Sequence, residues 1–193
     1  ISDITPKVVA RYARRMGIST PIKPYSSLAL GSSDVIPLEL VSAYGVFANN
    51  GVHVEPVSIV RIEDKNGNII YEARSERKEV LSEETTCIIN NMLQDVIKRG
   101  TGYGVVRDFK FYGPAGGKTG TTNDYTNAWF VGFTPDIVSG VWIGLDDFKL
   151  SLGRGMTGGV AALPFWGEFM KSVYDSLDFT HREFRQSSGV VKL

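Results

Sequence analysis

The stretch of sequence that decides the fold lies at residues 113–144 and reads GPAGGKTGTTNDYTNAWFVGFTPDIVSGVWIG. A glycine-rich beginning is followed by two runs of aromatic and β-branched residues, at 128–133 and 138–144, which a Thr-Pro-Asp turn separates. Such runs, bounded by turn residues, are typical of strands. Together with residues 113–119 they predict an antiparallel sheet.

Segments with helical patterns lie on both sides of this stretch. Each begins at a capping residue or close to a proline and carries apolar side chains three and four residues apart. These features predict helices over residues 5–17, 37–48, 82–100 and 161–177, and we expect the second of them to be buried. An Asn-Gly turn between two strand-like runs predicts a hairpin over 56–74. The predicted fold class is α+β, an antiparallel sheet flanked by helices.

Composition limits the classes of function. The chain has 193 residues, 42% of them apolar and 22% charged, which suits one globular domain. Twenty-one basic residues balance twenty-one acidic ones, so the net charge favours no nucleic-acid partner. Cys87 and the two separated histidines lack metal-ligand spacing, and we expect neither a metal nor a cofactor. Apolar stretches are too short to span a bilayer. Because the sequence begins with Ile1 rather than Met, we expect a piece of a longer protein.

The segment with the strongest chemical signal is Gly116-Gly117-Lys118-Thr119-Gly120-Thr121-Thr122. Glycine lets a peptide backbone approach a strand closely, while threonine hydroxyls and a lysine ammonium hold negative charge. This combination favours recognition of an extended peptide that ends in a carboxylate. In a strand with a purely structural role we expect β-branched residues in place of the glycines.

Two other readings compete for these residues. A phosphate-binding loop needs a glycine five residues before the Gly-Lys-Thr, where this chain has Tyr112, and it must open a helix, whereas an aromatic strand follows here. A glycine-rich strand and turn without function is the other reading.

Three tryptophans either line a ligand groove or pack in the core. We prefer core packing because of their places on predicted strands and a predicted helix. They are Trp129, Trp142 and Trp166.

The surrounding sequence resembles the transpeptidase domain of class A penicillin-binding proteins. The resemblance is carried by 114–122, Asn123-Asp124-Tyr125, 128–135, 140–144 and Asp146-Asp147. Shorter matches upstream, such as Ala43-Tyr44, and downstream, such as Thr157-Gly158-Gly159, extend it over about 28–171. The Thr-Thr after Lys-Thr-Gly fits class A better than the monofunctional class B enzymes or β-lactamases.

The family uses three elements, Ser-x-x-Lys, Ser-x-Asn and Lys-Thr-Gly, of which this chain has the third with certainty. No Ser-x-Asn occurs. Ser75-Glu76-Arg77-Lys78 fits the first pattern literally, but charged neighbours would leave its lysine solvated and its serine unactivated, so we interpret it as a coincidence. The resemblance therefore implies that residues 1–193, the hairpin of 56–74 included, are the C-terminal portion of a transpeptidase domain, incomplete in this chain.

The resemblance also implies roles for individual residues. Lys118 would hydrogen-bond toward the serine of Ser-x-Asn and aid proton transfer, and the Thr121 backbone N–H would stabilise the oxyanion. Contacts to the substrate or antibiotic would come from Thr119, Gly120, Thr121, Thr122 and Asn123.

The implied function is peptidoglycan D,D-transpeptidation, in which an acylated serine cross-links stem peptides and is the target of β-lactams. The implied partners are the N-terminal portion carrying that serine, the stem peptides and β-lactam antibiotics. The implied location is the extracytoplasmic face of the bacterial plasma membrane, where a segment outside this chain anchors a bifunctional parent.

A non-catalytic peptide-binding or structural module, which kept the recognition strand without the nucleophile, is the alternative. In the enzyme we expect Lys118, Thr119 and Thr121 to line a groove whose opposite wall comes from another segment. This chain would then present an unpaired sheet edge and an exposed apolar face.

Overall fold

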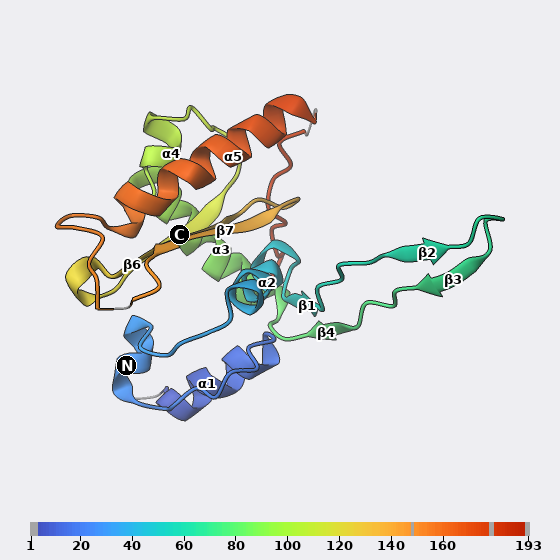
Figure 1. Ribbon diagram of the computed structural model, residues 1–193, viewed down its shortest axis with the longest axis horizontal. Coiled ribbons are helices and arrows are strands. Elements are labelled where there is room, and N and C mark those ends of the chain that lie inside the picture. Colours follow the sequence, from blue (N-terminus) through green and yellow to red (C-terminus); the bar gives the residue numbers. More distant parts are fainter. Residues whose placement is uncertain (1–3, 148, 178–179, 192–193) are drawn as a thin grey trace.

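The computed structural model describes residues 4–147, 149–177 and 180–191 (Figure 1). The helices are α1 (Pro6–Arg15), α2 (Pro37–Ala48), α3 (Glu83–Arg99), α4 (Gly104–Arg107) and α5 (Leu163–Ser176), with shorter helical turns η1 (Ser26–Leu30), η2 (Asn123–Tyr125) and η3 (Gly158–Ala162). The strands are β1 (Val52–Val54), β2 (Arg61–Glu63), β3 (Ile69–Glu72), β4 (Arg77–Glu79), β5 (Gly116–Thr121), β6 (Asn127–Phe133) and β7 (Val138–Gly144).

The predicted antiparallel sheet is confirmed, with strand order β5-β6-β7. Its register pairs Gly116 with Phe133 and Trp129 with Trp142. The first strand begins at Gly116 rather than at 113, because Pro114 has no N–H to donate to a ladder. Among the described residues β5 pairs only with β6, which makes it an edge strand.

The main core lies between this sheet and α5, which crosses one of its faces in Figure 1. Trp166 of α5 and Phe130 of β6 are fully buried, with their ring centroids 5.2 Å apart. Edge-to-face packing of this kind stabilises cores beyond simple burial. Core packing is thereby confirmed for Trp166. It is wrong for Trp142, which is 42% exposed and whose Nε1–H donates to Asn127 Oδ1.

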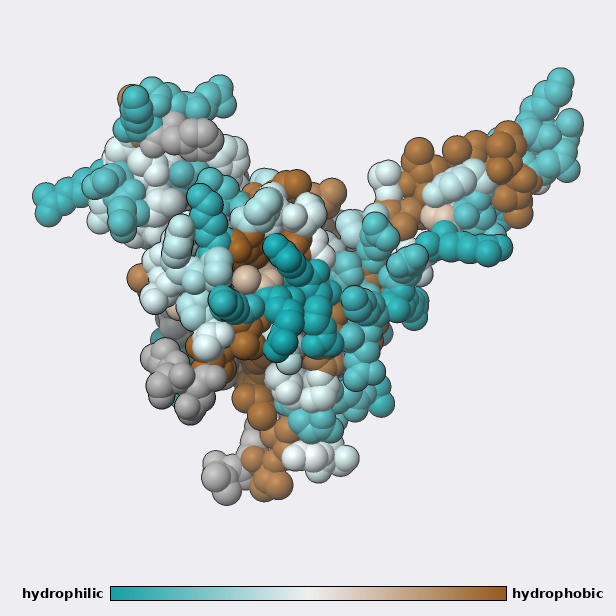
Figure 2. Space-filling model, turned by 90° about the horizontal axis from the view of Figure 1, so that it is seen from below, coloured by the Kyte–Doolittle hydropathy of each residue, from teal (hydrophilic) through white to brown (hydrophobic). Residues whose placement is uncertain are grey.

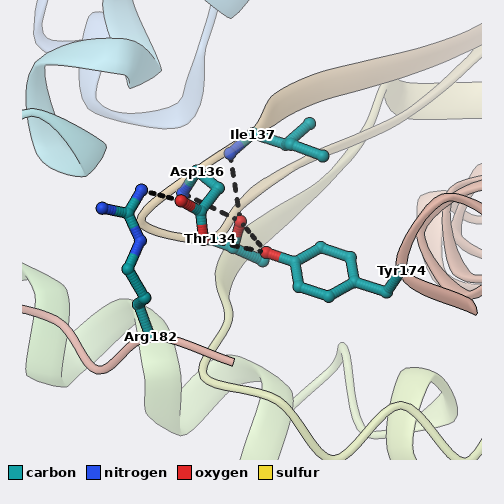
Figure 3. Close-up of polar contacts among 5 residues, drawn as sticks. All are labelled: Thr134, Asp136, Ile137, Tyr174 and Arg182. Atoms are coloured by element: carbon teal, nitrogen blue, oxygen red, sulfur yellow. Dashed lines mark hydrogen bonds and ion pairs between the residues drawn. The ribbon is translucent and has the colours of Figure 1, made fainter. Parts of the chain in front are cut away.

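A hydrogen-bonded network fastens α5 and the C-terminal segment to the turn between β6 and β7 (Figure 3). The Thr134 hydroxyl accepts from the backbone N–H of Ile137 at 3.1 Å and from the Tyr174 phenol at 2.7 Å. Burial raises the pKa of Tyr174, and the Thr134 hydrogen bond opposes this only in part. Arg182 forms an ion pair with Asp136 in the same turn. The network holds the end of the sheet in place.

The helices follow their sequence signals closely at α3. Ser82 caps its N-terminus by accepting from the Thr85 N–H at 3.3 Å, and acidic and basic residues occupy its first and last turns. The expectation of a buried helix at 37–48 is wrong. Only Ala43 and Val46 of α2 are buried and Leu38 in its first turn is 64% exposed, although α2 contacts β1, β6, β7 and α3.

A long arm projects from the body of the molecule, with β2 and β3 near its tip (Figure 1). These strands pair antiparallel, and the Asp64 carboxylate in the turn accepts from the backbone N–H groups of Asn66 and Asn68 at 2.8 and 2.9 Å. Hydrogen bonds from Asn68 are the main cause that lowers the pKa of Asp64. At the base of the arm β1 pairs with β4.

No helix in the described part of the chain has the length and apolar character needed to cross a membrane.

Candidate active-site strand

The backbone of β5 turns alternate residues toward β6 and toward the open edge. Just beyond the strand, the Thr122 N–H donates to the Asn127 carbonyl at 3.1 Å, so the peptide groups of Thr122 face β6. Successive residues of an antiparallel strand point their N–H and C=O groups to opposite sides. The backbone groups of Thr119 and Thr121 therefore face the open edge, where an extended peptide can pair with them.

Lys118 lies on the exposed part of β5. Its Nζ donates to the Thr119 carbonyl at 2.8 Å, which brings the ammonium to the open edge of the sheet. The ion pairs found within the described residues do not include Lys118. Its charge is thus available to a ligand at this edge.

Thr119 and Thr121 project from the opposite face of the strand to Lys118. The Thr119 hydroxyl lies 2.9 Å from the hydroxyl of Thr101, which follows α3. The Thr121 hydroxyl accepts from the Gly158 N–H at 3.0 Å and keeps its own hydrogen to donate. The two hydroxyls are thus held in fixed positions by residues from other parts of the chain.

Thr101 and Gly158 are site residues that the sequence motifs did not indicate as such. They come from two connections, one after α3 and one before α5, that are 18 and 37 residues from their threonine partners. The Thr157-Gly158-Gly159 match was the only signal pointing to either of them. Contacts of this kind arise from tertiary packing and have no local period.

The glycines of β5 have an internal reason for lacking side chains. A Cβ on Gly116 would lie 2.8 Å from the Phe133 ring, and one on Gly120 would lie 3.1 Å from the Trp129 Cβ. Gly117 is enclosed in the same way by Phe130. The inference that these glycines make room for a ligand's backbone is therefore wrong for Gly116 and Gly117, which are both buried. For Gly120, packing within the chain already accounts for the missing side chain.

Thr122 and Asn123 lie at the turn that follows β5. The Thr122 hydroxyl accepts from the Asn127 N–H at 2.8 Å and is 2.8 Å from the Thr126 hydroxyl, so it closes the turn. Asn123 is exposed at the start of η2. The Leu152 N–H donates to the Tyr125 carbonyl at 2.8 Å, which ties the turn to the segment before α5.

Ser75 and Lys78, the literal Ser-x-x-Lys match, do not form a common site. Ser75 lines a cavity of about 520 Å³ along the arm, whereas Lys78 lines a different one of about 450 Å³ beside α1. Both side chains are exposed. A nucleophile and its base need hydrogen-bond contact in a shared cleft, so this arrangement supports reading the match as a coincidence.

Comparison with known proteins agrees with the sequence motifs. The family described as penicillin binding protein transpeptidase domain matches residues 16–155. Penicillin-binding protein 1A of Aquifex aeolicus is 43% identical over 176 residues, which are 90% of this chain and 24% of that protein. Penicillin-binding protein 1A of Neisseria gonorrhoeae is 38% identical, over 83% of this chain and 21% of its own length. The chain thus spans about a quarter of these curated relatives.

The fold agrees as well. The crystal structure of penicillin-binding protein 1A from Haemophilus influenzae superposes with a TM-score of 0.84 at 27% identity, over 94% of this chain and 32% of the other. PonA1 from Mycobacterium tuberculosis shares the fold with a TM-score of 0.82 at 19% identity. The predicted fold class is confirmed. The chain belongs to the penicillin-binding protein transpeptidase domain family, as its class A motifs indicated.

Proposed function

We propose that this chain forms the Lys-Thr-Gly wall of a peptidoglycan D,D-transpeptidase active site. The observation that carries the proposal is the open edge of β5, with the Lys118 ammonium at it and the backbone groups of Thr119 and Thr121 directed toward it. The serine nucleophile is supplied by another segment of the longer protein, because no activated serine–lysine pair is found among the described residues.

The substrate binds by adding a strand to the sheet. An extended stem peptide lies antiparallel to β5 and exchanges backbone hydrogen bonds with Thr119 and Thr121. Its terminal carboxylate accepts hydrogen bonds from the two threonine hydroxyls, which Thr101 and the Gly158 N–H hold in place. Asn123 is exposed beyond the end of β5 and contacts a part of the substrate that extends past the strand. Thr122 closes the turn after β5.

The chemistry follows from these positions. The serine hydroxyl attacks the carbonyl of the penultimate D-Ala, and the oxyanion that develops accepts a hydrogen bond from the Thr121 N–H. The terminal D-Ala leaves with a proton, and the amine of a neighbouring stem then resolves the ester. The Lys118 ammonium stabilises negative charge near the serine during proton transfer. A β-lactam acylates the same serine, and the enzyme works on the extracytoplasmic face of the plasma membrane, where its substrate lies.

The test is covalent labelling with a fluorescent penicillin, followed by mapping of the labelled residue. We expect the longer protein to be labelled at a serine outside this chain, and the 193-residue chain alone to remain unlabelled. A label on Ser75 would overturn the assignment of the nucleophile. No label on the longer protein would favour the alternative of a non-catalytic peptide-binding module.

A further inference from the structure

The outward face of α1 is lined with positive charge. Lys7, Arg11, Arg14 and Arg15 stand at positions i, i+4, i+7 and i+8 of the helix, which places them on one side. Seen from below in Figure 2, strongly hydrophilic residues gather over α1. With Lys78 of β4, these side chains surround an open pocket of about 450 Å³. A chain with no net charge therefore concentrates five cations around one cavity.

These cations have no acidic partner in the described part of the chain. The ion pairs found there involve other basic residues, and no Asp or Glu lines the pocket. Arg15 stacks over the Tyr12 ring at 5.1 Å and reaches the Glu79 carbonyl at 3.5 Å. Unpaired like charges held close together destabilise a fold, and a bound anion relieves that repulsion.

Helix stability alone does not explain the arrangement. Arg14 and Arg15 lie in the last turn of α1, where cations interact favourably with the helix dipole. Lys7 lies in the first turn, where the dipole disfavours a cation, and no acidic residue accompanies it there. The helix dipole therefore does not account for the position of Lys7.

The backbone on both sides of the pocket packs against the rest of the chain. The inner face of α1 packs through Ala13 and Met16 on a small core of Ile18, Ile22 and Ala43. Lys78 lies opposite His53 in the β1–β4 ladder. Ala10, Ile22 and Pro24 give the pocket an apolar floor, and its volume suits a small organic ligand.

We propose that this pocket binds a multiply charged phosphate group. Guanidinium groups bind phosphate oxygens through two parallel hydrogen bonds, and three arginines with two lysines match two or more negative charges. The phosphate group belongs either to a free molecule or to the headgroup of an anionic lipid, since both present the same oxygens. The proposal does not depend on the activity of the β5 edge.

The test is calorimetric titration with inorganic pyrophosphate in about 150 mM salt, where weak surface attraction is screened. We expect binding that the double variant Arg11→Gln/Arg14→Gln weakens at least about tenfold, because each lost arginine removes charge-assisted hydrogen bonds. The matched control Lys65→Gln/Lys171→Gln removes the same charge elsewhere and should change the dissociation constant less than about twofold. Glutamine preserves helix propensity, and thermal unfolding by circular dichroism verifies the fold of each variant.

A second experiment uses vesicles of phosphatidic acid, whose phosphomonoester carries up to two negative charges, and vesicles of phosphatidylcholine. Sedimentation with the phosphatidic acid vesicles but not with the phosphatidylcholine vesicles, lost in the Arg11→Gln/Arg14→Gln variant, assigns the phosphate to a lipid headgroup. Pyrophosphate binding without sedimentation assigns it to a free molecule. Three results overturn the proposal: no pyrophosphate binding by the chain, equal weakening in the control variant, or binding by the chain that is absent from the longer protein.

Discussion

Replacing Gly158 with alanine tests whether the turn before α5 positions β5. A Cβ at Gly158 would lie 2.1 Å from the Trp129 carbonyl oxygen and 2.5 Å from that of Gly120. Both are backbone atoms of the paired strands, so they cannot rotate away as the end of a side chain would. The turn must therefore shift, which breaks the hydrogen bond from the Gly158 N–H to Thr121.

The expected cost combines two effects. Overpacking in a close-packed region costs about 1–3 kcal/mol, and the lost hydrogen bond adds about 0.5–1.5 kcal/mol. We expect Gly158→Ala to lower the free energy of unfolding of the 193-residue chain by about 2–4 kcal/mol, measured by urea denaturation. Because the Thr121 hydroxyl loses its support, acylation of the longer protein should slow as well.

Gly45→Ala is the matched control, since a Cβ there meets nothing within 4 Å. Gly45 lies inside α2, where alanine is the better helix former, and this change should stabilise the chain by about 0.5–1 kcal/mol. The same substitution thus has opposite signs at the two sites. A Gly158→Ala protein as stable as the parent would refute the close packing of the turn on β5.

Three further predictions concern the frame of the site. Thr134→Val keeps the side-chain shape but removes the hydroxyl that accepts from the Tyr174 phenol at 2.7 Å. Chemical denaturation should show a loss of about 1–3 kcal/mol, and an unchanged stability would contradict the network. Ser82→Ala should cost about 1 kcal/mol in the same assay, because α3 loses its cap, whereas Ser58→Ala on the arm should have no effect. The pKa of Asp64 is lowered in the folded chain, so its carboxylate stabilises the turn of the arm at any pH above the pKa of an unfolded aspartate. This contribution should disappear as the pH falls through the lower pKa of the folded chain. Amide chemical shifts of the turn that titrate at the ordinary aspartate pKa would contradict the prediction.

The sheet and α3 could be predicted from the sequence because their signals are local. The runs at 128–133 and 138–144 have strand composition and a turn between them, and Ser82 is a capping residue before an apolar helical pattern. The strand that carries Lys118 could be recognised from the Gly116–Thr122 motif and the matching residues that follow it. These features depend on neighbours within a few residues, which the sequence displays directly.

Features that depend on distant partners could not be predicted. The apolar pattern of α2 indicates a side suited to burial, but Leu38 in its first turn stays exposed although the helix contacts β1, β6, β7 and α3. Trp142 looked like a core residue on the same evidence as Trp166. The position of Thr101 beside β5 leaves no mark in the local pattern, and that of Gly158 was signalled only by the Thr157-Gly158-Gly159 match.

The central claim is that the open edge of β5 is an active-site wall, and the most direct test is the acylation rate of Lys118→Ala. The second-order rate constant for a fluorescent penicillin is measured in the longer protein, with Lys65→Ala at the tip of the arm as the control. Loss of one preorganised electrostatic group costs about 3 kcal/mol in the barrier, so the rate should fall about 150-fold, while the control acylates like the parent. Equal rates for Lys118→Ala and Lys65→Ala would contradict the account.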